Sequence, residues 1–568
     1  MRPIVTDTAP RLTSSSGVKV REGLGARLPD RRRKEGAPRE PSARAINSRR
    51  AVASLTVGLL VLAGCTRSES HRRPRASSAF APSVQEVPCP PDVAHEPRYL
   101  DGSRVKELSC GSLTVLEDRT KPDGRTIRLF FVRVPPPGNN PEPDPVFTAG
   151  GADLARNGGF NGGPLAERVN REVIIMNERG VGLSEPNLAC PEVQQLALPT
   201  SGAPLGSRDM QPRFLVAVQA CHDRLEAQGI DLASYNLAEA AADAEDLRTA
   251  LGIETWNITA TGTASAIAFE IMRRFPEHVR AAWFDSPAAP QVDLFTQAVL
   301  GTRYSIREVA KACAAQPACH AAYPRVLVAW RQVLQRLHEN PVELSADEGY
   351  GVVVDDASAV RVMRGMLSWF DYRFLPSLFR LRNHRFTHRR SPTFDIYPEV
   401  NLGRNVEPWQ SDPVLSHGYT VDHWDEWRFS AGAFYSILCH DELPFVAHAS
   451  LSQAVDGDPW YVRAYGHRNP YIEACGRWDV GSAEADPHDP VVSDIPTLIL
   501  HPHFDPFSPF PLIKQTAKTL LTSWVVDLQW GHNVLSQDCP VAIRNGWIDD
   551  PTSPPDTSCV ADMPEMRL

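Results

Sequence analysis

Two residue types that cooperate in acyl-transfer chemistry, an aspartate and a histidine, stand near the end of the chain. Asp505 occurs in LILHPHFDPFSP and His532 in QWGHNVL, each just after a short apolar run that is typical of a β-strand. A carboxylate that accepts a hydrogen bond from an imidazole fixes its tautomer and stabilises its protonated form, so the other ring nitrogen can take and return a proton. An aspartate before proline also starts many turns, and most histidines are structural, but the order and spacing favour the paired role.

A pair of this kind needs a nucleophile, which serine enzymes with the chain order Ser–Asp–His carry on a sharp strand-to-helix turn within G-x-S-x-G. The strand-to-helix junction in the right place is TWNITATGTASAIAFEIMRRFPEHV, residues 255–279. It contains no G-x-S-x-G. The sequence therefore predicts the acid and the base of a catalytic triad without the usual serine.

The elements that must position these residues are strand-length apolar runs alternating with helical patterns. The runs are continuous, as in strands covered on both faces. They comprise residues 127–134, 145–151, 172–180, 255–260, 280–286, 495–502 and 524–531, and residues 238–252 between them have helical periodicity. This alternation predicts an α/β fold with a mostly parallel central sheet flanked by helices. Because such sheets carry their sites at the carboxyl ends of the strands, Asp505 and His532 are expected at one edge.

The N-terminal part of the chain has a different composition. Residues 1–50 hold 13 Lys and Arg against 5 Asp and Glu, and the apolar run of residues 51–64 follows the basic pair Arg49-Arg50. That run is short for a membrane span and has the layout of an export signal. Its end, Leu62-Ala63-Gly64-Cys65, resembles a bacterial lipobox, in which the cysteine is lipidated; a short anchor helix or plain cleavage is the alternative.

These patterns divide the chain into five parts. We expect a basic, unstructured leader with a lipoprotein signal peptide (1–64), a flexible tether (65–88), a first half of the core (89–290), a helical cap (291–490) and a second half of the core (491–568). The expected location is the bacterial cell envelope, with the mature chain lipid-anchored to the membrane surface, or periplasmic or extracellular.

Charge and cysteine content exclude several classes of protein. Removal of residues 1–64 leaves 46 Lys and Arg against 63 Asp and Glu, a net charge of −17, whereas nucleic-acid binding needs a basic surface. Besides Cys65 there are ten cysteines, an even number that in an exported chain indicates disulfides, and no C-x-x-C that would favour a metal site. A sequential pairing is expected: Cys89–Cys110, Cys190–Cys221, Cys313–Cys319, Cys439–Cys475 and Cys539–Cys559. We expect no cofactor and no metal.

Several segments resemble one known family. From Cys89 to Ala561 the chain resembles the tripeptidyl-aminopeptidase and proline-iminopeptidase group of α/β hydrolases, in particular at CHDELPF (439–445) and at the closing loop of residues 539–559. The family's nucleophile turn is roughly W-N-L-Y-G-V-S-Y-G-T, followed by a helix and P-E-H-V. A gapless comparison from either flank puts Gly262 on the serine and leaves Ala260-Thr261-Gly262-Thr263-Ala264 in place of G-x-S-x-G. The resemblance thus implies an α/β-hydrolase fold with a helical cap, and a glycine that cannot perform covalent catalysis.

The resemblance also implies roles for other residues. Backbone N–H groups of Gly151 and Thr263 would form the oxyanion hole. The loop that carries Gly151 is AGGAD (149–153) instead of H-G-G-P-G, so it departs from the family pattern. In peptidase relatives, acids of the cap bind the free amine of the substrate; Asp441 and Glu442 are the candidates here, with a solvated or capping carboxylate as the alternative.

Three functions remain open from the sequence. The first is a catalytically silent or weakened hydrolase-fold lipoprotein that binds a peptide or small acyl ligand. The second is an active serine-type peptidase or esterase that uses Thr261, Thr263 or Ser265 as its nucleophile. The third is an envelope protein that docks partners through its cap. In none of these do we expect nucleic acid as a partner, and a membrane enters only through the lipid at Cys65.

Overall fold

The computed structural model describes residues 80–90, 93, 108–136, 140–149, 165, 169–197, 210–344, 352–368, 430–465, 470–532 and 534–563. The predicted leader, the export signal and Cys65 therefore lie outside the described residues, as does most of the predicted tether.

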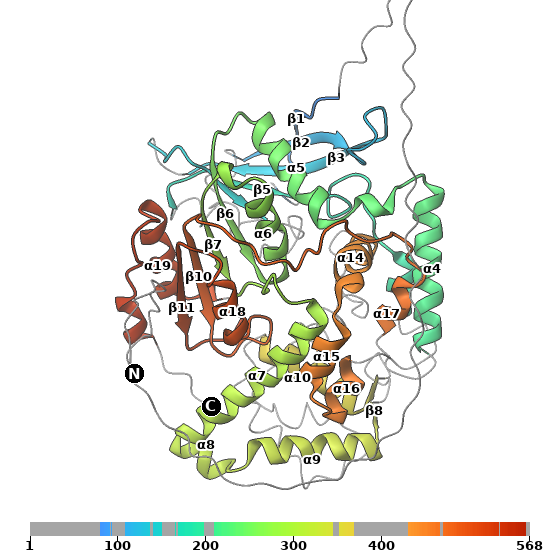
Figure 1. The fold of residues 1–568 in the computed structure, drawn as a ribbon, viewed down its shortest axis with the longest axis vertical. Coiled ribbons are helices and arrows are strands. Elements are labelled where there is room, and N and C mark those ends of the chain that lie inside the picture. The colour runs from blue at the N-terminus through green and yellow to red at the C-terminus, as the bar shows by residue number, and fades with distance from the viewer. Residues whose placement is uncertain are drawn as a thin grey trace, which may run out of the picture. The chain divides into compact units, whose positions relative to one another are not determined.

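One nine-stranded sheet organises the described residues, with its strands in the order β1-β2-β3-β5-β4-β6-β7-β10-β11 (Figure 1). The pairs β1–β2, β2–β3 and β3–β5 are antiparallel, and all neighbours from β5 across to β11 are parallel. The strands are β1 (Ser83–Val87), β2 (Ser109–Leu116), β3 (Thr126–Val134), β4 (Val146–Thr148), β5 (Val173–Met176), β6 (Trp256–Thr261), β7 (Val279–Asp285), β10 (Thr497–Pro502) and β11 (Ser523–Leu528). The predicted mostly parallel α/β sheet is confirmed, and all seven predicted apolar runs contain a strand.

The predicted apolar runs did not include the first two strands, β1 and β2. The predicted tether of residues 65–88 ends in β1, which pairs with β2 from Ser83 opposite Thr114 to Val87 opposite Cys110. β1 is an edge strand in which only Val84 and Val87 are half-buried. Its order comes from the ladder to β2 and from the nearby disulfide between Cys89 and Cys110, not from its own composition, which is why the apolar pattern did not reveal it.

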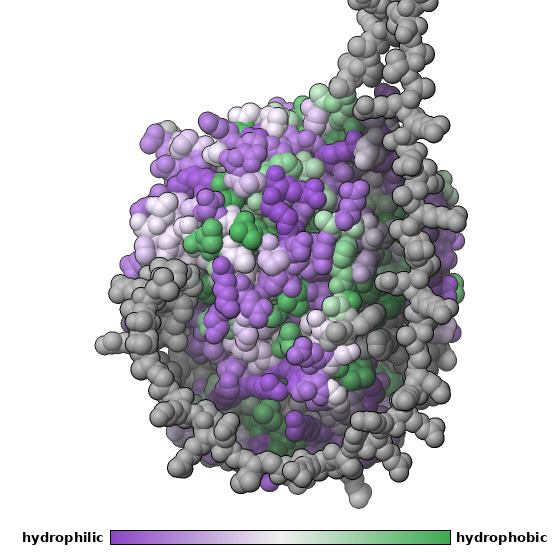
Figure 2. Space-filling model, viewed as in Figure 1, coloured by the Kyte–Doolittle hydropathy of each residue, from purple (hydrophilic) through white to green (hydrophobic). Residues whose placement is uncertain are grey.

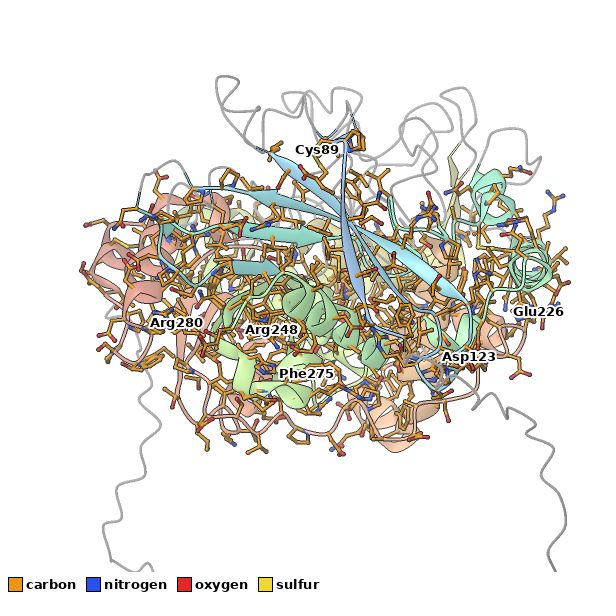
Figure 3. The ribbon with its side chains drawn as sticks, turned by 90° about the horizontal axis from the view of Figure 1, so that it is seen from above. Cys89, Asp123, Glu226, Arg248, Phe275 and Arg280 are labelled. Atoms are coloured by element: carbon orange, nitrogen blue, oxygen red, sulfur yellow. A yellow bond between two sulfur atoms is a disulfide. The ribbon has the colours of Figure 1, made fainter. Side chains whose placement is uncertain are left out.

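Helices cover both faces of the parallel strands. On one face α5 (Leu237–Ala250), α6 (Ser265–Arg274) and α18 (Phe510–Thr516) pack with residues such as Phe284. On the other face α19 (Asp538–Asp549) packs with residues such as Trp283. The successive residues Trp283 and Phe284 of β7 thus pack on opposite faces of the sheet, because side chains alternate along a strand. Figure 3, at right angles to Figure 1, labels Arg248 near the end of α5 and Phe275 just after α6.

A mainly helical segment separates β7 from β10. It contains α7 (Leu294–Ala315), α8 (Pro317–Ala322), α9 (Val326–Glu339), α10 (Asp356–Ser368), α14 (Ala431–Ile437), α15 (His448–Val455), α16 (Pro459–Tyr465) and α17 (Pro470–Cys475), and a small antiparallel pair of β8 (Val342–Leu344) and β9 (Val352–Val354). These helices share an apolar core with α4 (Met210–Ala227), which precedes β6. We refer to residues 291–490 as the helical cap. Among the described helices, none combines the length and the apolar composition that a membrane crossing needs.

Five disulfides join the ten described cysteines in the sequential pattern that the sequence predicted. They are Cys89–Cys110, Cys190–Cys221, Cys313–Cys319, Cys439–Cys475 and Cys539–Cys559. The predicted disulfide framework is therefore confirmed.

The face shown in Figure 2 has both hydrophilic and apolar side chains. Hydrophilic side chains predominate there among the described residues, and apolar side chains occur in small separate groups.

Candidate functional site

The turn from β6 into α6 brings Gly262 opposite His532. A short 3-10 turn, Gly262–Ala264, follows β6 and continues into α6. Gly262 has a φ of +58°, which side-chain-bearing residues rarely adopt. A Cβ atom placed on this glycine would lie 3.7 Å from Cε1 and 3.9 Å from Nε2 of His532. The residue that the sequence comparison put at the nucleophile position is thus the one that faces the imidazole.

The predicted acid and base meet across neighbouring strand ends. Asp505 follows β10, His532 follows β11, and Nδ1 of His532 lies 3.1 Å from Oδ2 of Asp505. The other carboxylate oxygen of Asp505 accepts the N–H of Phe507 at 2.9 Å, and the residue is fully buried. An ionised carboxylate only accepts hydrogen bonds, so Nδ1 carries the proton that donates to it. Nε2 therefore faces Gly262.

The charges around His532 favour its protonated form. Burial alone would lower the pKa of this imidazole, but the carboxylates of Asp505 and Asp285 outweigh burial and the opposing charge of Arg364, and the pKa is raised above its usual value. A raised pKa is the shift that a general base needs, because the imidazole must hold a proton during acyl transfer.

Asp285 is a residue of the site that the sequence analysis missed. It is the last residue of β7, is fully buried, and accepts the N–H groups of Val534 at 3.2 Å and Leu535 at 3.1 Å. Burial raises the pKa of its carboxyl group. These bonds hold the loop just after His532, so Asp285 positions the imidazole. Its signal in the sequence was its place at the end of a predicted strand, the same signal that identified Asp505.

Arg364 and Phe507 were also missed. The ring of Phe507 lies 5.1 Å from the imidazole of His532 between centroids, and the guanidinium carbon of Arg364 lies 4.0 Å from the centroid of Phe507. Arg364 comes from α10 of the helical cap and is only 5% exposed. No motif surrounds it in the sequence, because only the packing of the cap against the core brings it to this place.

The three hydroxyl groups considered as substitute nucleophiles are placed differently. The Ser265 hydroxyl donates to the carbonyl of Gly262 at 2.7 Å and accepts the N–H of Ala288 at 3.0 Å, in a buried position. Thr261 is half-buried at the end of β6, and Thr263 is exposed. Within the described part of the chain, His532 has its side-chain hydrogen bond to Asp505 and none to these hydroxyls. The contacts give Ser265 a structural role at the turn.

Of the two residues predicted to form the oxyanion hole, Thr263 lies within the described residues and Gly151 does not. Thr263 is the second residue of the turn after β6, where a helical N–H has no partner within its own helix. Gly151 lies outside the described residues; the described part of its loop ends at Ala149, whose N–H donates to the carbonyl of Thr259.

Asp441 and Glu442 contact the starts of two helices. They lie on a π-helical turn, Leu438–Glu442, and both are buried. Asp441 accepts the N–H of Leu237 at the start of α5 at 2.9 Å, and Glu442 accepts the N–H of Leu294 at the start of α7 at 3.1 Å. Carboxylates are stabilising at such positive helix ends. These contacts are those of capping residues, and binding of a substrate amine by either acid stays a prediction.

The contact between Glu442 and His488 predicts a pH-dependent stability. Burial opposes protonation of His488, but hydrogen bonds to Glu442 and Asp486 prevail and raise its pKa from 6.5 to about 9. A raised pKa stabilises the fold fully below the unfolded value, and this contribution disappears as the pH rises through the folded value. We expect His488→Gln to lower the free energy of unfolding in urea at about pH 6 and to have little effect at about pH 10. An equal loss at both pH values would contradict the prediction.

One group of described residues has the composition of a cation site. His222, Asp223 and Glu226 of α4 bring their ligand atoms within 4.8 Å of one another. Exposed acidic groups on one helix often lie together without an ion, so this group alone does not define a metal site.

The fold and the site together define a class of protein. The sheet order, the acid and the histidine after the last two strands, and the strand-to-helix turn opposite them are those of an α/β hydrolase. Residues 462–559 match the family described as TAP-like protein. The chain thus has the fold of an α/β hydrolase, and its C-terminal segment is similar to the TAP-like family.

Known proteins resemble parts of the chain. A tripeptidyl aminopeptidase of Streptomyces lividans is 27% identical over 34% of this chain and 38% of its own length. Carboxylesterase B of Mycobacterium tuberculosis is 24% identical over 43% of this chain and 51% of its own length. The matched part thus spans between about a third and a half of these relatives. The structure of proline iminopeptidase from Mycobacterium smegmatis aligns with 75% of this chain and 96% of its own, at 14% identity and a TM-score of 0.33.

Proposed function

We propose that the protein is an exported α/β-hydrolase-fold lipoprotein, anchored through Cys65 in the bacterial cell envelope, that binds a peptide or small acyl ligand without forming an acyl-enzyme. The observation that supports this most strongly is Gly262, which faces Nε2 of His532 and has no hydroxyl to attack a carbonyl carbon. The acid–histidine pair behind it is complete. Because the acid–histidine pair has no nucleophile to activate, its proposed role is to bind the ligand.

The class of ligand follows from the relatives. One is called a tripeptidyl aminopeptidase and another a carboxylesterase, names that refer to peptide and ester substrates. The apolar run before Cys65 and its likeness to a lipobox support the proposal of export and lipidation. The disulfides agree with an oxidising compartment.

Turnover tests the loss of catalysis. The wild-type chain and His532→Ala are compared with a tripeptidyl p-nitroanilide and a p-nitrophenyl ester as substrates. We expect the same background rate from both, because an imidazole without a nucleophile contributes no covalent pathway. Wild-type turnover that disappears in His532→Ala would show that a nucleophile acts and would refute the proposal.

A further inference from the structure

We infer that His503 is a protonation-dependent latch between the cap helix α7 and the loop that carries Asp505. While its imidazole is protonated, the latch joins a carboxylate of the core to a carboxylate of the cap, and deprotonation releases α7. The inference rests on the proposed function and adds to it a regulation by pH, because the latch controls access of a ligand to the position between Gly262 and His532.

His503 lies between two carboxylates that come from different parts of the fold. Its Nδ1 lies 3.0 Å from Oδ2 of Asp527 in β11, and its Nε2 lies 3.4 Å from Oε2 of Glu308 in α7. The three side chains are between 14% and 20% exposed, so solvent screens these ion pairs less than it screens surface pairs. A neutral imidazole has one N–H and one lone pair, and it therefore attracts one of the two carboxylates and repels the other. Only the protonated ring can hold both.

The core side of the latch is held independently of the cap. Oδ1 of Asp527 lies 2.8 Å from Nδ1 of His501, and Nε2 of His501 donates to the carbonyl of Ser508 at 2.6 Å. The backbone N–H of His503 donates to the carbonyl of Leu528 at 2.7 Å. These bonds keep the loop between β10 and α18 in place when the contact with the cap is lost, so α7 is the partner that moves.

α7 lies directly on this loop. A Cβ atom placed on Gly301 of α7 would lie 1.8 Å from the carbonyl oxygen of Pro506, so the two backbones touch there. Tyr304 and Glu308 follow Gly301 at helical spacing, and the ring of Tyr304 lies 6.3 Å from that of His503 between centroids. Because Pro506 directly follows the acid of the site, a movement of α7 away from the loop uncovers the site. α7 is the first helix of the cap and runs towards α8 and α9 (Figure 1).

The charges around His503 make the latch depend on pH. Burial opposes protonation of this imidazole, but its two carboxylate partners prevail and raise its pKa above the usual value of 6.5. Three further titratable groups lie beside the latch: Tyr304, His501 and Lys311, the last of which binds the other oxygen of Glu308 at 2.6 Å. A raised pKa stabilises the closed form fully below the usual value, and this contribution disappears as the pH rises through the pKa of the closed form.

A thiol at the site measures how accessible the site is. Gly262→Cys places it opposite His532, and peptide mapping after treatment of the full chain with iodoacetamide gives its alkylation rate. We expect His503→Gln or Glu308→Ala, added to Gly262→Cys, to raise this rate about tenfold or more at about pH 6, because each removes a charge-assisted contact. At about pH 10 the ratio to Gly262→Cys alone should fall to within about twofold, since the latch is then open in every chain. Each ratio is taken at one pH, which cancels the titration of the thiol.

Arg307→Gln is the matched control. Arg307 is exposed and directly precedes Glu308 on α7, so its loss changes the charge of the helix outside the latch, and alkylation should stay within about twofold of Gly262→Cys alone.

Hydrogen exchange of α7 provides a second measurement, in a chain with an intact latch. Corrected for the intrinsic exchange rate, the protection of α7 should fall as the pH rises through the pKa of His503. His488→Gln is the background for this measurement, because His488 also titrates and contacts Glu442 at the start of α7.

Four results would overturn the inference. They are unchanged alkylation in both latch variants at about pH 6, the same acceleration at both pH values, an equal acceleration by Arg307→Gln, or protection of α7 that does not change with pH. Melting temperatures identify a variant that does not fold, in which case the hydrogen exchange decides. None of these results depends on a ligand or on turnover, so failure of the proposed function appears separately, as hydrolysis that requires His532.

Discussion

Gly262→Ser is expected to give the protein a hydrolytic activity that the proposed function excludes for the wild type. The new hydroxyl would extend from a position 3.9 Å from Nε2 of His532, within reach of the base that Asp505 already orients. The strain of a serine at a positive φ costs about 1–3 kcal/mol, which a stable fold can bear. We expect kcat/KM for a tripeptidyl p-nitroanilide to rise by about a hundred- to a thousandfold, less than a full triad contributes, because the loop of residues 149–153 departs from the family pattern.

Gly262→Ala is the matched control for this experiment. Alanine has the same backbone strain and contacts the imidazole in the same way, but it has no hydroxyl, so it should show no gain. Adding His532→Ala to Gly262→Ser should remove the gain. Hydrolysis by Gly262→Ser that persists without His532 would mean that the hydroxyl and the imidazole do not act together.

The second large effect is expected on stability, at Asp243 of α5. This carboxylate is fully buried and accepts Nε and Nη2 of Arg179, both at 2.7 Å, as well as Nη2 of Arg119 at 2.7 Å. Arg179 is also buried and extends from the loop after β5, where it donates to the carbonyls of Glu117 and Ser234. Asp243→Ala leaves the buried guanidinium of Arg179 with Glu239, 3.2 Å from its Nη2, as its remaining carboxylate. We therefore expect a loss of about 3 kcal/mol in the free energy of unfolding in urea, the low end of the range for a broken buried ion pair.

Asp246→Ala provides the control for Asp243→Ala. Asp246 pairs with the same Arg119 at 2.6 Å, but the side chains of both residues are about a quarter exposed. Surface pairs contribute about 1 kcal/mol or less, so this variant should unfold close to wild type. Similar losses for the two variants would show that burial of Asp243 is not what makes its ion pairs important.

The sequence predicted those parts of the fold that depend on local patterns. Continuous apolar runs located seven strands, and the positions of Asp505 and His532 just after two of them were enough to expect both at one edge of the sheet. Gly262 was found by its register between two flanks. The apolar pattern did not reveal β1 because only Val84 and Val87 of its five residues are apolar and its order comes from pairing with β2.

The residues that could not be predicted take their roles from tertiary contacts. Arg364 reaches the site through the packing of α10 over Phe507, which no spacing in the sequence indicates. Asp285 accepts the backbone N–H groups of the loop after His532, whereas Asp505 contacts the imidazole as well as a backbone N–H, and the sequence does not distinguish these two roles. The capping contacts of Asp441 and Glu442 depend likewise on where α5 and α7 begin.

Labelling with a fluorophosphonate tests most directly whether a nucleophile is missing. The probe reacts only with an activated hydroxyl, and intact-mass measurement with peptide mapping identifies the residue that carries it. We predict no adduct on the wild-type chain or on Gly262→Ala, and one adduct on Gly262→Ser, at residue 262. An adduct on Thr261, Thr263, Ser265 or any other hydroxyl of the wild-type chain, lost in His532→Ala, would contradict the account.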